Sequence, residues 1–202
     1  MEKIETILRR KQPELQLFCD NVHSSQNISA ILRSCDGAGV LHFAYSVNDD
    51  QTLRIHKTIT QGAHRWVERK RIDTADKTDF LKKKKENGYQ ILVTHIDEGA
   101  LSFREVDYTR PTVIVMGNEK DGVSKEVLAQ ADHTIIIPMM GMVQSLNVSV
   151  ASALILFEAQ RQREAAGMYK RARLSETERN RYKAEWIRRD MIVRRSKGWI
   201  MA

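Results

Sequence analysis

The segment NVHSSQNISAILR, residues 21–33, combines amide, hydroxyl and guanidinium side chains at the start of a predicted helix. Asn27 can cap this helix, and Arg33 follows six residues later, within the second turn. A guanidinium at that point could reach a phosphate or a ribose hydroxyl, because it presents several donors in a fixed fork. It could equally be a surface charge beside Asp36, and this segment alone favours that simpler interpretation.

A second segment, GNEKDGVS at residues 117–124, separates a strongly apolar stretch from a short predicted helix. Gly117 and Gly122 allow the backbone to approach a ligand closely or to adopt a positive φ. Glu119 lies between them, where a carboxylate has no evident structural role. Such a loop can hold a nucleoside. It lacks the spacing of a Walker A loop and of the GxGxxG fingerprint, so it is a weak signal by itself.

The third segment, residues 137–163, is the most specific and begins IPMMGMVQSLN. Pro138 ends a predicted strand, and a flexible loop rich in methionine follows it. Ser145 and Asn147 then open a long helix lined by small residues, which permit close backbone packing. Both residue types are common helix caps, so their polar groups admit two interpretations: capping of the helix, or contact with a ligand.

Short apolar runs and helical periodicities alternate along the chain, and these elements must position the three segments. The pattern predicts strands at residues 15–19, 41–47, 90–94, 112–116 and 134–137. It predicts helices at residues 1–14, 27–37, 77–87, 124–130, 146–164 and 174–193. Strands that are apolar throughout and separated by helices indicate a buried parallel sheet in an α/β domain. Ligands of such sheets bind beyond the carboxyl ends of the strands, where the three segments lie.

Composition excludes several other classes of protein. A chain of 202 residues with 42% hydrophobic and 29% charged residues indicates one ordered globular domain. No apolar run approaches the roughly 20 residues needed to cross a bilayer, and residues 1–14 lack the apolar stretch of a signal peptide. We therefore expect a cytoplasmic protein. Cys19 and Cys35 form no CxxC pair and the histidines show no ligand spacing, so we expect reduced, partly buried thiols and no metal.

The net charge of +7 is concentrated near the C-terminus. Residues 161–202 contain 13 Lys and Arg against 5 Asp and Glu, whereas the preceding 160 residues are close to neutral. A segregated basic segment suggests a polyanionic partner, although a solvated helix face explains the charge equally well. Residues 82–85 are four consecutive lysines. A solvated helix face is their favoured interpretation, and an RNA contact is the alternative.

Taken together, the three segments resemble the three motifs of the SpoU/TrmH family, the SpoU branch of the SPOUT methyltransferases. The resemblance covers about residues 21–170 and rests on Asn27, Arg33, Gly117, Glu119, Ser145, Leu146 and Asn147. It implies an enzyme that uses S-adenosylmethionine to methylate a ribose 2′-hydroxyl in tRNA, at guanosine 18 of the D-loop. The implied fold is an α/β parallel sheet with a C-terminal trefoil knot, a rare exception to unknotted chains. A homodimer would hold the RNA across both subunits.

The resemblance also implies roles for individual residues. Five of them would line a pocket for bent S-adenosylmethionine, namely Thr94, Gly117, Ile137, Met139 and Leu146. Because a guanidinium stays protonated, Arg33 would stabilise charge developing on the attacking oxygen and grip the neighbouring phosphate, rather than act as a base. Asn27, Glu119, Ser145 and Asn147 would position the hydroxyl, Arg33 and the cofactor. This scheme requires no metal.

Basic residues near both ends of the chain would contact RNA phosphates through salt-sensitive interactions, namely Arg9, Arg10, Arg161, Arg163, Arg171 and Arg173. The expected organisation is an N-terminal helical extension at 1–14, a SPOUT methyltransferase domain at 15–167 and a basic C-terminal helical extension at 168–202. The resemblance fades beyond about residue 173, which leaves open the role of the tail and the set of tRNAs that is accepted.

Three other functions compete with this prediction. A related enzyme acting on ribosomal RNA usually carries an additional N-terminal RNA-binding domain, whereas the first motif here begins within thirty residues of Met1. A non-catalytic RNA-binding protein of the same fold would be favoured by the loss of Arg33, Glu119 or Asn147, and all three are present. A nucleotide-binding α/β domain of other chemistry would be expected to carry a phosphate-loop signature.

Overall fold

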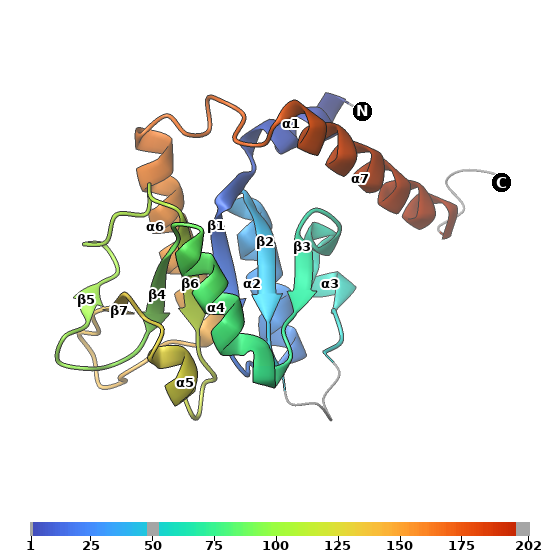
Figure 1. Cartoon of the computed structure of the whole chain (residues 1–202). Coiled ribbons are helices and arrows are strands. Elements are labelled where there is room, and N and C mark those ends of the chain that lie inside the picture. Colours follow the sequence, from blue (N-terminus) through green and yellow to red (C-terminus); the bar gives the residue numbers. More distant parts are fainter. Residues whose placement is uncertain (1, 48–52, 197–202) are drawn as a thin grey trace.

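A seven-stranded sheet, parallel in every described pairing, forms the centre of the molecule (Figure 1). The computed structural model describes residues 2–47 and 53–196. The strands are β1 (Gln12–Cys19), β2 (Val40–Tyr45), β3 (Glu68–Arg71), β4 (Gln90–Thr94), β5 (Leu101–Ser102), β6 (Thr112–Met116) and β7 (His133–Ile136). Their order is β3-β2-β1-β6-β4-β7-β5. β2 and β3 follow on one side of β1, and β4 to β7 lie on its other side. The strand order therefore reverses at β1, and α/β proteins bind ligands at such a switch point.

Helices cover the two faces of the sheet unequally. On one face lie α2 (Ser25–Gly37), α3 (Lys57–Thr60) and α6 (Val148–Ala165), together with a 3-10 turn, η1 (Ala63–Arg65). On the other lie α4 (Lys77–Glu86), preceded by the turn η2 (Thr74–Asp76), and the short α5 (Lys125–Leu128). In Figure 1, α4 and α5 stand in front of the central strands, while β2 and β3 are seen with no helix in front of them.

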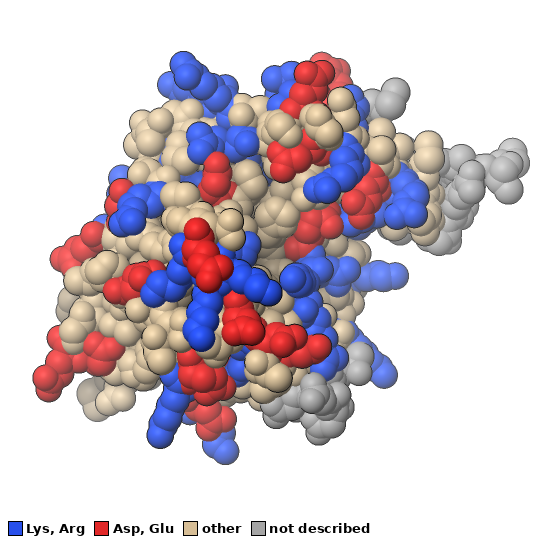
Figure 2. Space-filling model, viewed as in Figure 1, with Lys and Arg blue, Asp and Glu red and all other residues tan. Residues whose placement is uncertain are grey.

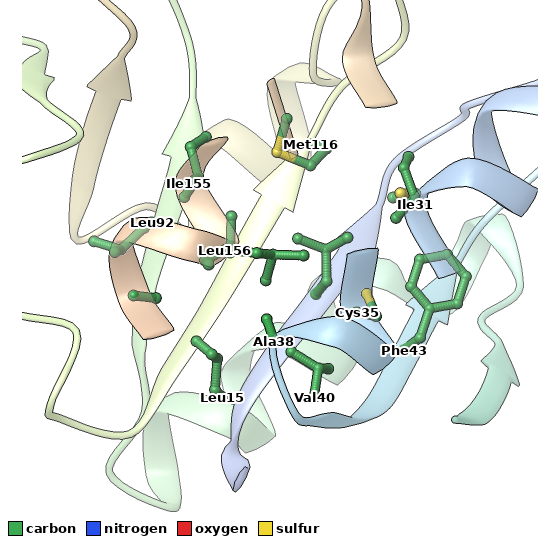
Figure 3. Close-up of a cluster of buried hydrophobic side chains, with 14 of the residues drawn as sticks. Leu15, Ile31, Cys35, Ala38, Val40, Phe43, Leu92, Met116, Ile155 and Leu156 are labelled. Atoms are coloured by element: carbon green, nitrogen blue, oxygen red, sulfur yellow. The ribbon is translucent and has the colours of Figure 1, made fainter. Parts of the chain in front are cut away.

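Two apolar cores separate these layers. The larger one lies under α2 and α6, and Figure 3 shows Leu15, Ile31 and Leu156 converging in it. The smaller one includes Phe18 and Leu81 and lies under α4. Leu15 and Phe18 both belong to β1 and face opposite cores, which explains why apolar residues occur on both faces of this strand.

A third, separate cluster docks both ends of the chain onto the sheet. Here α1 (Glu2–Arg10) packs against α7 (Glu176–Ser196) through a set of buried side chains: Leu8, Leu41, Leu174, Tyr182 and Trp186. Glu5 of α1 forms ion pairs with Arg179 and Lys183 of α7. Part of the positive charge of the C-terminal segment is therefore neutralised within the protein. The helix predicted at residues 174–193 is the single helix α7, and its inner side is buried.

The predicted elements are confirmed in the interior of the sheet and differ at its margins. The strands β4 and β6 have the predicted bounds. By contrast, β1 begins at Gln12, so residues 12–14, which were expected to be helical, belong to the sheet. Neither β3 nor β5 was predicted. The sequence of β3 is ERKR, and an edge strand with no apolar residue has no periodicity to detect.

Cys19 and Cys35 are free thiols, and both are fully buried in the larger core. Burial raises the pKa of Cys35 to about 12 and raises that of Cys19 as well, so neither is a reactive thiolate at neutral pH. Within residues 2–47 and 53–196, no helix is long and apolar enough to cross a membrane.

Candidate active site

A cavity of about 580 Å³ opens at the carboxyl ends of β4, β6 and β7. All five residues predicted to bind the cofactor line it: Thr94, Gly117, Ile137, Met139 and Leu146. Glu119, Ser145 and Asn147, from the predicted catalytic set, line it too. The second and third segments thus meet beside the end of β4, because parallel strands deliver their loops to the same edge of the sheet. The size suits a nucleoside-sized ligand.

The loop after β6 depends on its first glycine. A Cβ atom at Gly117 would lie 2.4 Å from the carbonyl carbon of Gly122 and 2.5 Å from the nitrogen of Val123. The two backbone segments can approach this closely only because Gly117 has no side chain. Gly122 has a φ of +70°, and Asn118 and Gly122 exchange two backbone hydrogen bonds of 2.9 Å. The result is a tight turn that presents Glu119 at the mouth of the cavity.

A chain of side-chain hydrogen bonds connects the three segments. The Ser149 hydroxyl and backbone N–H both donate to Asn147 Oδ1, at 2.6 and 2.8 Å. Since this oxygen is occupied, the Asn147 Nδ2 group turns outward and donates to Asn27 Oδ1 at 3.2 Å. Asn27 Nδ2 in turn donates to Glu119 Oε1. Each amide therefore fixes the orientation of the next, and Glu119 is held as a hydrogen-bond acceptor.

The helix caps differ in part from the prediction. Ser24, rather than Asn27, caps α2, and its hydroxyl oxygen accepts a 3.2 Å bond from the Asn27 N–H. The helix begins two residues before Asn27, whose side chain is consequently free to bond Glu119. Asn147 does cap α6, as the sequence allowed. Ser124 occupies the N-cap position of α5, but its side chain makes no capping bond.

A buried polar network that the sequence analysis missed supports the loops from below. Asp20, the residue directly after β1, is completely buried. Its carboxylate accepts from Lys77 Nζ at 2.9 Å, from the Ser124 N–H at 2.8 Å and from the Ser46 hydroxyl at 3.1 Å. Lys77, itself 1% exposed, also donates to the Ser124 hydroxyl. The sequence did contain a signal for this network: Asp20 is a carboxylate directly after an apolar strand, a position that lies at the carboxyl edge of the sheet.

Asn118 makes a second connection between the first and second segments. Its Nδ2 group donates to the Asn21 carbonyl at 2.8 Å, and its Oδ1 accepts from the Lys120 N–H at 2.7 Å. The loop that carries Glu119 is thereby tied to the loop that leads to Asn27. These contacts fix the position of the two segments relative to each other in the folded chain.

Arg33 is the predicted catalytic residue that the structure does not bring to the cavity. It is exposed on α2, and its Nη1 lies 3.5 Å from the carbonyl oxygen of Ile59 in α3. It does not line the cavity of its own chain. Its side chain is open to a ligand from outside the molecule.

One predicted RNA-binding residue is misassigned. Arg163 is completely buried, and burial lowers the pKa of its guanidinium. Its Nε donates to the Tyr108 carbonyl at 2.8 Å, and its two terminal nitrogens donate to Gln12 Oε1 at 3.2 Å and to the Arg110 carbonyl at 3.0 Å. Arg163 lies four residues after the buried Ala159 of α6, and the helical period turns it into the core. It therefore cannot contact RNA.

The other predicted RNA contacts are exposed: Arg9, Arg10, Arg161, Arg171 and Arg173. Three of them have partners within the chain: Arg161 forms an ion pair with Glu158 and Arg173 forms one with Glu14, both at 2.7 Å, and Arg9 lies 3.7 Å from Glu5. Most of this set belongs to α1 and to the connection between α6 and α7, at the end of the molecule opposite the cavity (Figure 1).

A parallel α/β sheet whose cavity lies at the carboxyl edge, with small apolar and backbone groups inside and polar side chains at the mouth, defines a ligand-binding α/β protein built for a nucleoside-like molecule. Within the described residues, no group of His, Cys, Asp and Glu could hold a metal ion. The sequence profile of the SpoU rRNA Methylase family matches residues 14–157, and this chain belongs to that family.

Similar proteins extend the match to almost the whole chain. The tRNA (guanosine(18)-2′-O)-methyltransferase of Aquifex aeolicus is 45% identical over 197 residues, which are 98% of this chain and 92% of that protein. The enzyme of the same name from Thermus thermophilus is 50% identical over 188 residues, 93% of this chain and 95% of that protein.

Solved structures show the same fold. The crystal structure of the A. aeolicus TrmH/SpoU tRNA modifying enzyme matches with a TM-score of 0.89 at 46% identity, covering 94% of this chain and 95% of that one. The SpoU methyltransferase AviRb from Streptomyces viridochromogenes, in complex with the cofactor AdoMet, matches with a TM-score of 0.66 at 26% identity, covering 78% of this chain and 64% of that one.

Proposed function

We propose that this chain transfers a methyl group from S-adenosylmethionine to the ribose 2′-hydroxyl of guanosine 18 in tRNA. The observation that carries the proposal is the meeting of Asn27, Glu119 and Asn147 in one hydrogen-bonded chain at the mouth of the cavity. Family membership and the tRNA substrates named for the two relatives support the substrate and the reaction.

The cavity suits S-adenosylmethionine in its shape and chemistry. Ile135, Ile137 and Leu146 offer apolar contacts for an adenine ring, and the loop after β6 offers backbone groups. The shape of this loop depends on Gly117, since a Cβ atom there would collide with the backbone of Gly122 and Val123. When bound, the cofactor supplies an electrophilic methyl group. We propose that Thr94, Gly117, Ile137, Met139 and Leu146 hold it.

The chain's own residues then have to place and activate the hydroxyl. Glu119, held by Asn27, is oriented to accept a hydrogen bond from a ribose hydroxyl at the mouth of the cavity. Ser145 and Asn147 flank the same opening and fix the approach, and positioning of this kind supplies much of the rate of a bimolecular transfer. We assign Arg33 to the phosphate next to the target ribose and to charge developing on its oxygen.

A homodimer would complete this site. Val150, Leu154 and Phe157 recur at helical spacing along α6 and are 47%, 42% and 48% exposed. Such an apolar stripe on a surface helix favours a protein contact. We propose that a second copy covers it. Because Arg33 does not line the cavity of its own chain, the second copy is the natural source of an Arg33 for each cavity.

Three further properties complete the proposal. The second and third loops, which build the cavity, would belong to the trefoil knot. The exposed arginines Arg9, Arg10, Arg161, Arg171 and Arg173 would contact RNA phosphates. The protein would act in the cytoplasm.

The test uses S-adenosylmethionine with a labelled methyl group and unmodified tRNA. Because a 2′-O-methylated ribose blocks alkaline cleavage of the adjacent phosphodiester, label in an alkali-resistant dinucleotide containing guanosine 18 is the expected result. Label in ribosomal RNA but not in tRNA would keep the reaction and change the substrate. No transfer to either RNA, with the cofactor still bound, would contradict the proposed enzyme and favour a non-catalytic RNA-binding protein.

A further inference from the structure

One part of the sheet presents polar residues where the rest presents apolar core. On the side of the sheet that carries α4, the strands β1, β2 and β3 place Gln16, His42 and Glu68 in one cross-strand row. The next row toward the carboxyl edge is Phe18, Ala44 and Lys70. In Figure 1 no helix stands in front of β2 and β3, but side chains of α4 and α7 reach this face: Ala44 lies in the core under α4, and Tyr182 and Trp186 of α7 contact His42 and Glu68. We call the surface formed by Gln16, His42, Glu68 and Lys70, together with the bordering Lys84 and Arg181, the open sheet face.

Cations held on aromatic rings border the open sheet face. On the α4 side, Lys84 Nζ lies 5.5 Å from the ring centre of Phe80 and 5.0 Å from that of Tyr89. Lys70 Nζ approaches the same Phe80 ring at 5.8 Å. On the α7 side, the guanidinium of Arg181 lies 4.7 Å from the ring of Tyr182. Figure 2 shows Lys and Arg side chains gathered over α4 and beside β3 on this view of the molecule.

His42 connects the two borders. Its ring meets Tyr182 edge-on, with ring centres 6.4 Å apart. Burial lowers the pKa of His42, and the charges of Lys84 and Arg181 contribute to that shift, although they approach from opposite sides. Burial and the charge of Lys70 likewise lower the pKa of Lys84. Lys70 and Lys84 therefore interact with each other, and Lys84 and Arg181 both act on His42.

This positive charge is balanced only in part, because Glu178 lies near Arg181, whose charge, after hydrogen bonds from Ser175, helps to lower the pKa of that carboxylate. Among the described residues, Lys70, Lys84 and Arg181 form no ion pair. The carboxylate of Glu68 in the floor is already engaged by Arg189 at 2.8 Å. Like charges that converge with few counter-charges raise the local potential, and an anion placed among them is bound favourably.

The aromatic contacts distinguish these cations from ordinary surface lysines. A lysine packed on a ring has lost part of its rotational freedom before any ligand arrives, so less entropy is lost on binding. Lys82 and Lys83 lie exposed on the same helix, and within the described part of the chain they make no such contact. The open sheet face thus presents fixed cations at fixed separations, which suits the regular spacing of phosphates along a nucleic acid.

We propose that the open sheet face binds the sugar–phosphate backbone of the substrate RNA through Lys70, Lys84 and Arg181. The inference rests on the proposed RNA substrate and extends it to a surface separate from the cavity. Lys70 lies one residue from the end of β3, so it is near the carboxyl edge of the sheet, while the cavity opens farther along the same edge, at β6, β4 and β7. RNA that binds both places has to pass the carboxyl ends of β2 and β1.

The experiment compares two triple variants that remove the same charge. In one, Lys70, Lys84 and Arg181 of the open sheet face are changed to Gln. In the other, Lys82, Lys83 and Arg188 are changed to Gln; these three are exposed on α4 and α7 and lack the ring contacts described above. Binding of unmodified tRNA is measured by fluorescence anisotropy at several KCl concentrations, and circular dichroism verifies that both variants are folded.

We expect the first variant to weaken tRNA binding at least tenfold and to lower the slope of log Kd against log salt by about 2 to 3, as three lost phosphate contacts require. The second should change the affinity less than threefold and the slope by less than about 1. Equal effects of the two variants would overturn the proposal, because charge alone would then explain them. Unchanged binding by the first variant would overturn it too.

Methyl transfer by the unmutated chain, measured on the same tRNA, separates this inference from the proposed function. Transfer by the unmutated chain together with equal effects of the two variants would refute the open sheet face and leave the enzyme intact. Selective loss of binding in the first variant, without transfer by the unmutated chain, would support the surface and refute the enzyme.

Discussion

The two ends of the sheet use the same residue types for opposite purposes. At the carboxyl edge, Asn27 and Asn147 hold Glu119 at the mouth of a cavity, and Arg33 is exposed farther along α2, the helix that begins at this edge. Toward the amino edge, Arg163 is buried, and its guanidinium donates hydrogen bonds to Gln12 Oε1 and to backbone carbonyls. An arginine whose donors are all satisfied inside the protein supports the fold. An arginine left open at a ligand-binding edge is available for chemistry.

The comparison shows that the role of an arginine is assigned from its burial and its hydrogen-bond partners rather than from its charge. Arg163 was predicted to bind RNA because it belongs to a basic segment, and this prediction was wrong. Its neighbour Arg161, two residues earlier, faces solvent and forms an ion pair with Glu158 of its own helix. Two residues along a helix correspond to about 200° of rotation, enough to separate a surface role from a structural one.

Replacing Arg33 by Ala gives the largest expected effect. We predict a loss of methyl transfer of at least about 100-fold, because an electrostatic contact to the reacting oxygen is removed. The free energy of unfolding should change by less than about 0.5 kcal/mol, since the side chain is exposed. Single-turnover transfer to tRNA and urea unfolding measure the two quantities, and calorimetry should show unchanged cofactor affinity. Near-normal turnover would remove Arg33 from the mechanism.

Replacing Arg163 by Met should reverse this pattern. The change leaves Gln12 Oε1 and two backbone carbonyls without their donor, so we expect destabilisation by about 3 kcal/mol in urea unfolding. The turnover of folded protein should stay within about threefold of normal. Arg161→Met is the matched control, with an expected change below about 0.5 kcal/mol. A fully stable Arg163→Met variant that fails to bind tRNA would contradict this account and support RNA binding by Arg163.

Replacing Gly117 by Ala addresses the cavity. The added Cβ would meet backbone atoms at under 3 Å, so the loop has to move, and we expect S-adenosylmethionine to bind at least about tenfold more weakly, or about 1.4 kcal/mol. In Gly141→Ala, the corresponding Cβ meets nothing within 4 Å. Isothermal titration calorimetry should therefore find nearly normal affinity in this control. Equal affinities of the two variants would show that the loop after β6 does not hold the cofactor.

Neutralising Arg171 and Arg173 together gives the smallest expected effect. Arg173 is already paired with Glu14, so we expect the slope of log Kd for tRNA against log salt to fall by only about 1. Filter binding at several salt concentrations measures this slope. An unchanged slope would place the RNA contacts of the basic segment elsewhere. A fall of about 2 would show that Arg173 leaves Glu14 when RNA binds.

The sequence predicted the parts of this fold that are apolar and buried, since burial on both faces leaves a continuous signal. It predicted β4 and β6 and the convergence of the three loops for this reason. It missed β3, where an edge strand of charged residues leaves no apolar pattern. It also missed the Asp20–Lys77 pair, because the two residues are 57 positions apart and only the fold brings them together.

The cap of α2 shows a second kind of limit. Ser24 and Asn27 are both good N-cap residues, and the choice between them depends on where the first turn begins. In the structure Ser24 is the cap, and this leaves the Asn27 amide to Glu119, 92 positions away. A local pattern cannot decide between a cap and a long-range partner. The assignment of Asn27 to the site came from the family resemblance.

The most direct test of the account uses a tRNA in which guanosine 18 alone is replaced by 2′-deoxyguanosine. This substitution removes the acceptor oxygen and leaves the base, the backbone and every other ribose in place. We predict that labelled S-adenosylmethionine transfers its methyl group to the unmodified tRNA and not to the deoxy-substituted one, although both tRNAs bind with similar affinity. Undiminished labelling of the deoxy-substituted tRNA would contradict the account, because the methyl group would then be transferred to a different atom.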